Sequence, residues 1–240
     1  SSPCAGLLLV GLRDLRAGAG WGVIDAMGRP KAPWFALARS CRPVAVLLTD
    51  EGLNGLAVHL VNDTAAVVTG RLALALFSND HCLETAEAAV AIPPRGGTTL
   101  SSSSLFDGFR DVTYAYRFGP RPHELVVASL LDDDGSVLAR ATYLPDGPRR
   151  PVQSEIGLQA RVEPVDDQVW SLSVSTRRFA QFVSVEVPGF RASDSWFHLE
   201  PGGTRVTVLC PERSPEPDPD RVPMGQVRAL NSVECARVSS

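Results

Sequence analysis

Lysine is almost absent from this sequence: Lys31 is the only one among 23 lysine and arginine residues. The arginines are scattered along the chain, without a basic stripe that alternates with aromatic residues, so we expect no nucleic-acid partner. No apolar run approaches the length of about 18 residues that a membrane-spanning helix requires, so we also expect no membrane partner. The hydrophobic content of 44% and the charged content of 21% are those of an ordinary globular protein.

Cysteines are too widely spaced to predict a zinc site or a redox pair. The five cysteines are Cys4, Cys41, Cys82, Cys210 and Cys235, and no two of them form a C-x-x-C motif. His81 directly precedes Cys82, which is not the spacing of metal ligands. An odd number of cysteines favours free thiols and a reducing compartment, so we expect a cytoplasmic protein without a metal or another cofactor.

The motifs of common catalytic sites are missing. The sequence contains no G-x-S-x-G, no H-E-x-x-H and no phosphate-binding glycine loop. Residues 132–135 (Asp-Asp-Asp-Gly) resemble part of a calcium-binding loop, but they lack the glutamate ligand at the required spacing. We therefore interpret them as a hairpin turn, in which glycine tolerates a positive φ.

Residues 1–41 have the pattern of a single strand, a loop and a helix. Residues 7–10 (Leu-Leu-Leu-Val) form a continuous apolar run, as in a strand that is buried on both faces of a parallel sheet. After a glycine-rich loop, Pro30 or Pro33 suits the first turn of a helix, and Pro43 would end it. The predicted apolar face of the helix comprises Trp34, Leu37, Ala38 and Cys41. The segment is too small for a core of its own, so we interpret it as the last βα unit of a larger domain.

Residues 42–147 alternate with a period of two, which predicts β-strands. Leu72, Leu74 and Leu76 share one face of a predicted strand, and small alanines occupy the other. Further strands are predicted over residues 44–49, 56–61, 112–118, 125–131 and 136–144. Roughly seven short strands with regular turn signals favour an immunoglobulin-like sandwich.

Residues 148–240 predict a second, slightly smaller sandwich. The alternating apolar positions are Trp170, Leu172, Val174, Val183, Val185, Val187, Val206 and Val208. Residues 211–223 are rich in proline and acidic side chains, so we expect an irregular surface loop there. The predicted fold class is therefore all-β, with two immunoglobulin-like β-sandwiches.

Four aromatic residues of this last segment allow two interpretations. They are Trp170, Phe182, Trp196 and Phe197. If their rings were exposed and coplanar, they would stack against sugars and the chain would be a carbohydrate-binding module. We favour the interpretation that they fill the sandwich core, which is the usual role of alternating aromatic residues.

Several stretches of the sequence resemble a known family. Residues 20–25 (Gly-Trp-Gly-Val-Ile-Asp) and 28–37 (Gly-Arg-Pro-Lys-Ala-Pro-Trp-Phe-Ala-Leu) resemble the end of the catalytic barrel in the β-mannosidase branch of glycoside hydrolase family two. Residues 179–183, 193–203 and 230–232 are similar to that family's terminal sandwich. The resemblance covers nearly the whole chain.

This resemblance implies a domain organisation. Residues 1–41 would be the C-terminal remnant of a (β/α)8 barrel, residues 42–147 a linking immunoglobulin-like sandwich, and residues 148–240 the terminal one. Without the rest of its barrel, the run at residues 7–10 is expected to be sticky or disordered.

The resemblance also implies hydrolysis of terminal β-D-mannosides with retention of configuration. In such enzymes one glutamate, which follows an asparagine, is the general acid/base, and a second glutamate is the nucleophile. Both lie at the ends of earlier barrel strands, and this chain contains no Asn-Glu pair, so we expect no catalytic residue in it and no activity of the chain alone. The implied partners are its own catalytic barrel and, through the full-length enzyme, a β-mannoside or related glycan.

One departure from the family pattern leaves the substrate open. The family has W-Q-[LF]-N-D at the end of its last barrel strand, where this sequence has Val10-Gly11-Leu12-Arg13-Asp14. Asp14 is kept and is the one candidate here for a place in the sugar pocket. The tryptophan is replaced by Val10, which keeps open a sister activity such as that of an exo-β-glucosaminidase.

Overall fold

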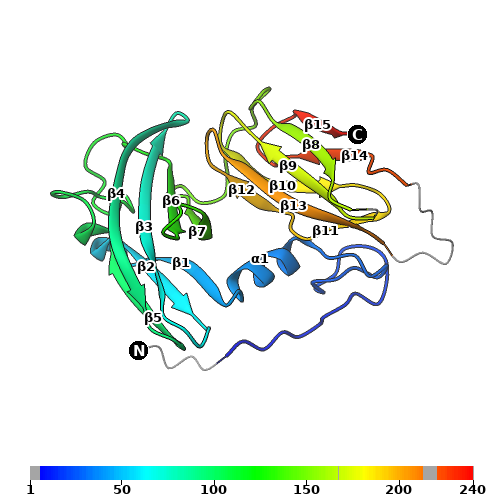
Figure 1. Ribbon diagram of the computed structural model, residues 1–240. Coiled ribbons are helices and arrows are strands. Elements are labelled where there is room, and N and C mark those ends of the chain that lie inside the picture. The colour runs from blue at the N-terminus through cyan, green and yellow to red at the C-terminus, as the bar shows by residue number, and fades with distance from the viewer. Residues whose placement is uncertain (1–5, 167, 213–220, 240) are drawn as a thin grey trace.

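The computed structural model describes residues 6–166, 168–212 and 221–239. Its fold is all-β: two antiparallel sandwiches lie next to each other, and a helix lies below the joint between them in the view of Figure 1. The predicted pair of immunoglobulin-like sandwiches is thus confirmed. No helix in the described part of the chain is long and apolar enough to cross a membrane.

The first sandwich consists of a three-stranded and a four-stranded sheet. The smaller sheet has the order β1-β2-β5, with β1 at Val44–Asp50, β2 at Leu56–Asn62 and β5 at Gly96–Ser101. The larger sheet has the order β4-β3-β6-β7, with β3 at Val68–Ser78, β4 at His81–Ile92, β6 at Leu125–Leu131 and β7 at Val137–Tyr143. Two short 3-10 helices, η1 at Gly52–Asn54 and η2 at Ser102–Ser104, follow β1 and β5.

The core of this sandwich follows the alternation of the sequence. Leu72, Leu74 and Leu76 of β3 are buried, as predicted, and pack with the buried leucines of β2. Residues 132–135 form the predicted hairpin turn between β6 and β7. The Asp132 carboxylate accepts hydrogen bonds from the N–H groups of Asp134 and Ser136, and Gly135 has a φ of 82°.

The terminal sandwich has two four-stranded sheets. One has the order β12-β10-β14-β15, with β10 at Ala180–Glu186, β12 at Phe197–Leu199, β14 at Gly225–Arg228 and β15 at Cys235–Val238. The other has the order β11-β13-β9-β8, with β8 at Gln159–Pro164, β9 at Trp170–Ser175, β11 at Phe190–Ala192 and β13 at Thr204–Pro211. Leu172, Val174 and Val183 lie in its core as predicted. Most of the loop expected at residues 211–223 lies outside the described residues.

A third, smaller apolar cluster connects the two sandwiches. Phe179, at the start of the β10 region, packs against Phe77 of β3 and against Leu125 and Val127 of β6. The backbone N–H of Phe179 also donates a hydrogen bond of 2.8 Å to the carboxylate of Asp80 in the β3–β4 turn. The joint between the sandwiches therefore has an apolar centre.

One strand prediction is wrong. Residues 112–118 form a loop rather than a strand, because the Asp111 carboxylate accepts hydrogen bonds from two N–H groups of a turn, and Tyr114 and Arg117 have left-handed φ values of 57° and 55°. The strand predicted around Val206 and Val208 is present as β13, and these two side chains lie on its outer face. The reason is the register with β9, which places Thr207 opposite the buried Leu172.

The first segment also differs from its prediction. Residues 7–10 form no strand and are exposed, because no neighbouring strand in the described chain pairs with them. The predicted helix is present as α1 (Ala32–Ser40), with a proline in its first turn. Its buried side chain is Phe35, whereas Trp34 is exposed, so the predicted apolar face is not the face that packs here.

The first prediction tests the core of the first sandwich. Leu74→Ala should lower the free energy of unfolding by about 2–5 kcal/mol, because it leaves a cavity among fully buried side chains. Leu83→Ala, on the neighbouring strand β4, is the matched control because Leu83 is exposed. Urea denaturation of both variants measures the difference, and equal losses would contradict this assignment of the core.

Candidate functional site

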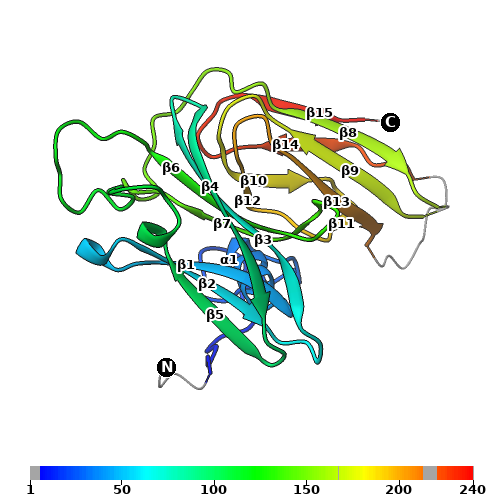
Figure 2. The same cartoon turned by 60° about the vertical axis from the view of Figure 1, so that its left-hand side comes forward.

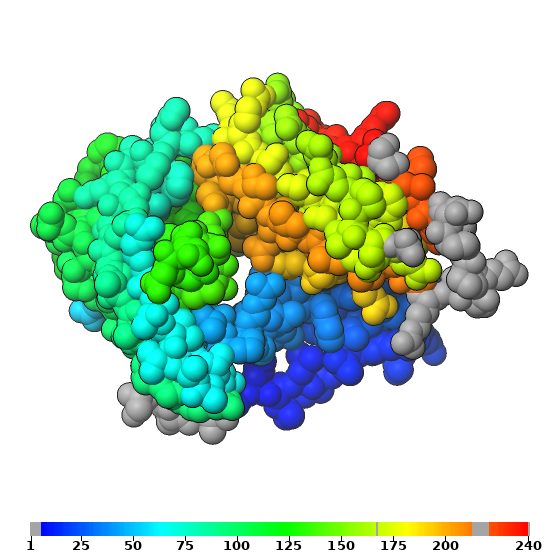
Figure 3. All heavy atoms as spheres, in the orientation of Figure 1, coloured from blue at the N-terminus to red at the C-terminus, as the bar shows by residue number. Residues whose placement is uncertain are grey.

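A groove of about 920 Å³ separates the first sandwich from the terminal sandwich. Its walls are formed by α1, β1 and β7 on one side and by the β12 and β13 region on the other, and Figure 3 shows a hollow between these surfaces. The charged side chains in its lining are Arg39, Arg42, Arg140, Arg205, Asp194 and Glu200. Most of them are engaged in ion pairs that cross between elements.

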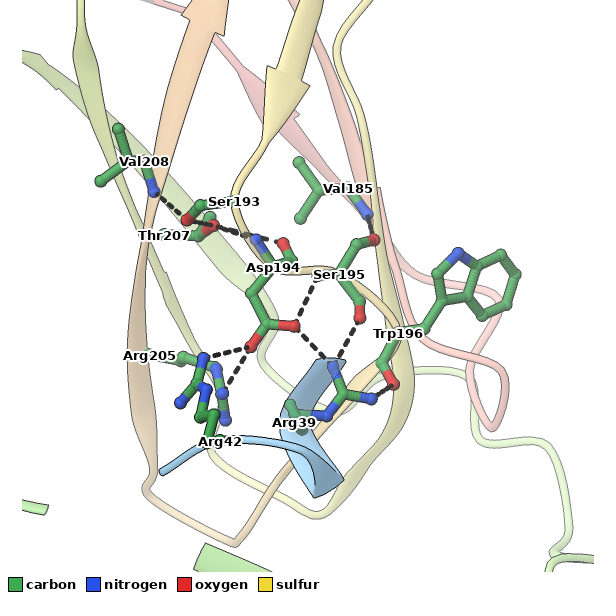
Figure 4. Close-up of polar contacts among 10 residues, drawn as sticks. All are labelled: Arg39, Arg42, Val185, Ser193, Asp194, Ser195, Trp196, Arg205, Thr207 and Val208. Carbon is green, nitrogen blue, oxygen red and sulfur yellow. Dashed lines mark hydrogen bonds and ion pairs between the residues drawn. The ribbon is translucent and has the colours of Figure 1, made fainter. Parts of the chain in front are cut away.

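Asp194 is the centre of the larger ion-pair network (Figure 4). Its carboxylate, which is 7% exposed, accepts hydrogen bonds of 2.5 Å from Arg39 of α1 and from Arg205 of β13. Arg42 lies 3.9 Å from the same carboxylate. One buried acid therefore joins the first segment of the chain to the terminal sandwich.

Arg39 also recognises the backbone of the turn that carries Asp194. Its guanidinium donates to the carbonyl oxygens of Ser195 and Trp196, both at 2.9 Å. The turn itself is fixed from the other side, because Thr207 accepts a hydrogen bond from the N–H of Asp194. The helix is thus held through three acceptors of one turn: the Asp194 carboxylate and the carbonyl oxygens of Ser195 and Trp196. The planar guanidinium of arginine can donate to all three, whereas the ammonium group of lysine lacks this geometry.

Burial lowers the pKa of Arg205, and the attraction of Asp194 opposes this effect. The Arg205 guanidinium also lies 4.9 Å from the centre of the Phe197 ring. A second ion pair, between Arg140 of β7 and Glu200 near the end of β12, crosses the groove directly. Together, these contacts fix α1 and both sandwiches relative to one another.

His198 lies beside this network and is held neutral. Its Nδ1 accepts a hydrogen bond of 3.1 Å from the N–H of Phe182, and its ring packs 4.4 Å from the Phe182 ring. Burial, with a smaller contribution from the positive charge of Arg39, lowers the pKa of His198 to about 4. The imidazole therefore acts here as a hydrogen-bond acceptor within the packed turn.

Asp14, the candidate for the sugar pocket, organises the glycine-rich loop of the first segment. Its carboxylate accepts hydrogen bonds from Lys31 Nζ at 2.8 Å and from the N–H of Gly22 at 2.7 Å. The hydrogen bond from Lys31, followed by that from Gly22, lowers the pKa of Asp14. A Cβ at Gly20 would lie 2.2 Å from the same carboxylate, so the loop requires glycine there. A role of Asp14 in sugar binding stays a prediction.

The aromatic residues are divided between core and surroundings. Phe197 is buried, and Trp170 packs partly buried against the same core, which confirms the core interpretation for these two. Phe182 and Trp196 are half-buried and have left-handed φ values of 46° and 57°. In the described residues, no cluster of histidine, cysteine or acidic side chains could hold a metal ion.

The arginine partners of Asp194 were not predicted. Arg39 and Asp194 are 155 residues apart, and neither belongs to a pattern that predicts the other. The available signal was that Asp194 lies within residues 193–203, which resemble the family, and that Arg39 lies just beyond the similar stretch at residues 28–37.

Comparison with known proteins supports this resemblance. A family model described as "Mannosidase Ig/CBM-like domain" matches residues 54–149. β-Mannosidase B of Aspergillus niger is 27% identical over 231 residues, which are 89% of this chain and 26% of that protein. The corresponding enzyme of Neosartorya fischeri is 28% identical over 223 residues, which are 85% of this chain and 25% of that protein.

The chain resembles the C-terminal region of a β-mannosidase-like glycoside hydrolase of family two. It spans about a quarter of the length of the curated relatives that it matches. The predicted family resemblance is thus confirmed.

Two solved structures share the fold of this chain. A β-D-mannosidase from Dictyoglomus thermophilum aligns with a TM-score of 0.68 at 14% identity, over 92% of this chain and 26% of that one. An exo-chitosanase from Amycolatopsis orientalis also aligns with a TM-score of 0.68 at 15% identity, over 95% of this chain and 30% of that one. The two scores are equal, so the fold alone does not distinguish the two substrates.

The second prediction concerns the Asp194 network. Asp194→Asn should lower the free energy of unfolding by about 3–5 kcal/mol, because it leaves Arg39 and Arg205 without their charge partner. Asp63→Asn is the matched control, since Asp63 pairs with Arg95 at an exposed position. Chemical denaturation of both variants measures the difference. A loss as small as that of the control would show that the network does not hold the joint.

The third prediction concerns pH. The folded pKa of His198, about 4, lies below its ordinary value of 6.5, so its contribution to stability is full above pH 6.5 and is lost as the pH falls towards 4. The loss should reach about 3 kcal/mol across this window. Denaturation curves at several pH values should show a weaker pH dependence for His198→Asn than for the unmodified chain. Identical pH dependence of the two proteins would show that His198 does not cause the loss of stability at low pH.

Proposed function

We propose that this chain is the C-terminal part of a retaining glycosidase that removes terminal β-D-mannosyl residues. In this proposal the two sandwiches support a catalytic barrel, and both catalytic glutamates come from the barrel. The similarity to two β-mannosidase B proteins, at 27% and 28% identity over most of this chain, supports it. The chain alone would then be inactive.

The observation that carries the proposal is the position of α1. This helix lies in the segment that resembles the end of the barrel, and Arg39 fixes it to the terminal sandwich through Asp194. On the same segment, Leu8 and Val10 are 86% and 83% exposed, and Trp21 is 98% exposed. Apolar surface of this kind marks a contact site, and the rest of a barrel is the partner that the proposal provides.

Asp14 has a supporting role in this proposal. Barrel active sites lie at the ends of the strands, and the predicted last strand would end near Asp14. Its pairing with Lys31 and Gly22 keeps the glycine-rich loop in one conformation. We infer that Asp14 shapes the sugar pocket by positioning this loop.

The related exo-β-glucosaminidase activity is the second candidate. It is favoured by Val10, which stands where the family pattern has tryptophan, and by the equal structural similarity to the exo-chitosanase. The two activities differ in the sugar that the barrel accepts. The rates of hydrolysis of a β-mannoside and a β-glucosaminide therefore distinguish them.

The cytoplasm is the compartment that we propose. Cys41, Cys82, Cys210 and Cys235 are free and exposed, as is usual for thiols kept in a reducing environment.

The fourth prediction tests the activity. The purified chain should release no nitrophenol from nitrophenyl β-D-mannoside. A chimera in which this chain replaces the matching region of the Aspergillus niger enzyme should release it, and should do so faster than from nitrophenyl β-D-glucosaminide. A chimera without the acid/base glutamate of the barrel is the control for contaminating glycosidases. Turnover by the chain alone would contradict the proposal, and an inactive folded chimera would show that this region does not support such a barrel.

A further inference from the structure

Three aromatic side chains lie together on the loop between η2 and β6. We call Phe109, Tyr116 and Phe118 the aromatic platform. The ring centres of Tyr116 and Phe118 are 5.7 Å apart with an angle of 31° between the ring planes, so these two rings give the flatter surface. The ring centres of Phe109 and Tyr116 are 5.1 Å apart with an angle of 82°, so Phe109 stands edge-on beside them. Phe109 is 61% and Phe118 is 76% exposed, so these rings contribute little to the core.

The loop that carries the platform projects from the first sandwich on the side away from the terminal sandwich. Figure 2 shows it as the green loop at the far left, and Figure 1 shows it on the same side. The helix α1 and the exposed apolar segment before it lie on a different side of the first sandwich. The barrel contact proposed above therefore does not account for the platform.

The platform is held in place although it is exposed. The two carboxylate oxygens of Asp111 accept hydrogen bonds from the N–H groups of Ala115 and Tyr116, at 2.8 and 2.9 Å. The Tyr116 hydroxyl donates to the carbonyl of Leu53 at 3.1 Å, which ties the loop to η1. Rings that are ordered before binding lose little conformational entropy when a ligand arrives.

The same loop contains backbone strain. Tyr114 and Arg117 lie before and after Tyr116 in the sequence. Their φ values are 57° and 55°, which residues other than glycine rarely adopt. The turn that Asp111 holds presents Tyr116 between these two residues. Strain of this kind is concentrated at ligand-binding loops.

A polar pocket of about 470 Å³ lies in the same loop region. Asp50, Arg117 and Arg121 line it, so it contains hydrogen-bonding groups of both charges. Arg121 pairs with Asp146 and stacks 4.5 Å from the Tyr114 ring. The Nε of Arg121 is buried and has no hydrogen-bond partner among the described residues, although a donor in such a position normally has one.

We propose that the aromatic platform and this pocket form a binding site for a neutral oligosaccharide. The apolar face of a pyranose ring fits the face of an aromatic ring, and its hydroxyl groups both donate and accept hydrogen bonds. Asp50 would accept from such hydroxyls, while Arg117 would donate to them. The mixture of charges favours a neutral sugar over an anion. This site goes beyond the proposed hydrolysis, because it holds glycan outside the barrel.

The fifth prediction tests this site by titrating the full chain with β-1,4-linked mannohexaose. Isothermal calorimetry or NMR should detect binding, and Phe118→Ala should weaken it about ten-fold. Arg117→Asn, which removes the charge but keeps a residue that tolerates the left-handed backbone, should also weaken it. Leu230→Ala is the matched control, because Leu230 is 60% exposed but lies in the terminal sandwich. Thermal melting should be unchanged in all three variants.

Three results would overturn the inference. The first is no binding to the unmodified chain at millimolar mannohexaose, and the second is equal affinities of Phe118→Ala and Leu230→Ala. The third is self-association that Phe118→Ala abolishes, which would make the platform a contact between copies of the chain. The titration uses no hydrolysis, so failure of the barrel chimera would leave its result unaffected.

Discussion

The buried carboxylate of Asp194 is the constraint on which the arrangement of this protein depends. Arg39 and Arg205 reach it from elements at opposite ends of the sequence, and each forms a hydrogen bond of 2.5 Å with it. A buried charge without its partners is strongly destabilising, so the three side chains must assemble together. The position of α1 follows from this requirement. The near absence of lysine suits the same design, since Arg39 donates to three oxygen atoms at once.

The sequence was sufficient where one face of a strand is buried. The period of two placed Leu72, Leu74 and Leu76 in the core, and aspartate with glycine predicted the turn at residues 132–135. These features depend on neighbours in the chain. The alternation also predicted the two sandwiches, and the family resemblance added the assignment of residues 1–41 to a barrel, which stays a prediction.

The alternation of apolar residues was not sufficient where polar contacts decide the local structure. Residues 112–118 alternate like a strand, yet hydrogen bonds to the nearby Asp111 make a turn more favourable. In β13 the strand was predicted, but the outer position of Val206 follows from the pairing with β9, which is distant in the sequence. The joint at Asp194 was missed for the same reason, since no local pattern indicates which of many arginines will approach a given acid. The role of Asp14 remains a prediction.

Phe179 has a consequence for how the whole chain folds. It belongs in sequence to the terminal sandwich, but it packs in a cluster with Phe77, Leu125 and Val127 of the first sandwich. Unfolding of either sandwich would therefore expose apolar surface of the other. The stability of each includes a contribution from its neighbour, and we expect the unfolding of the two sandwiches to be coupled.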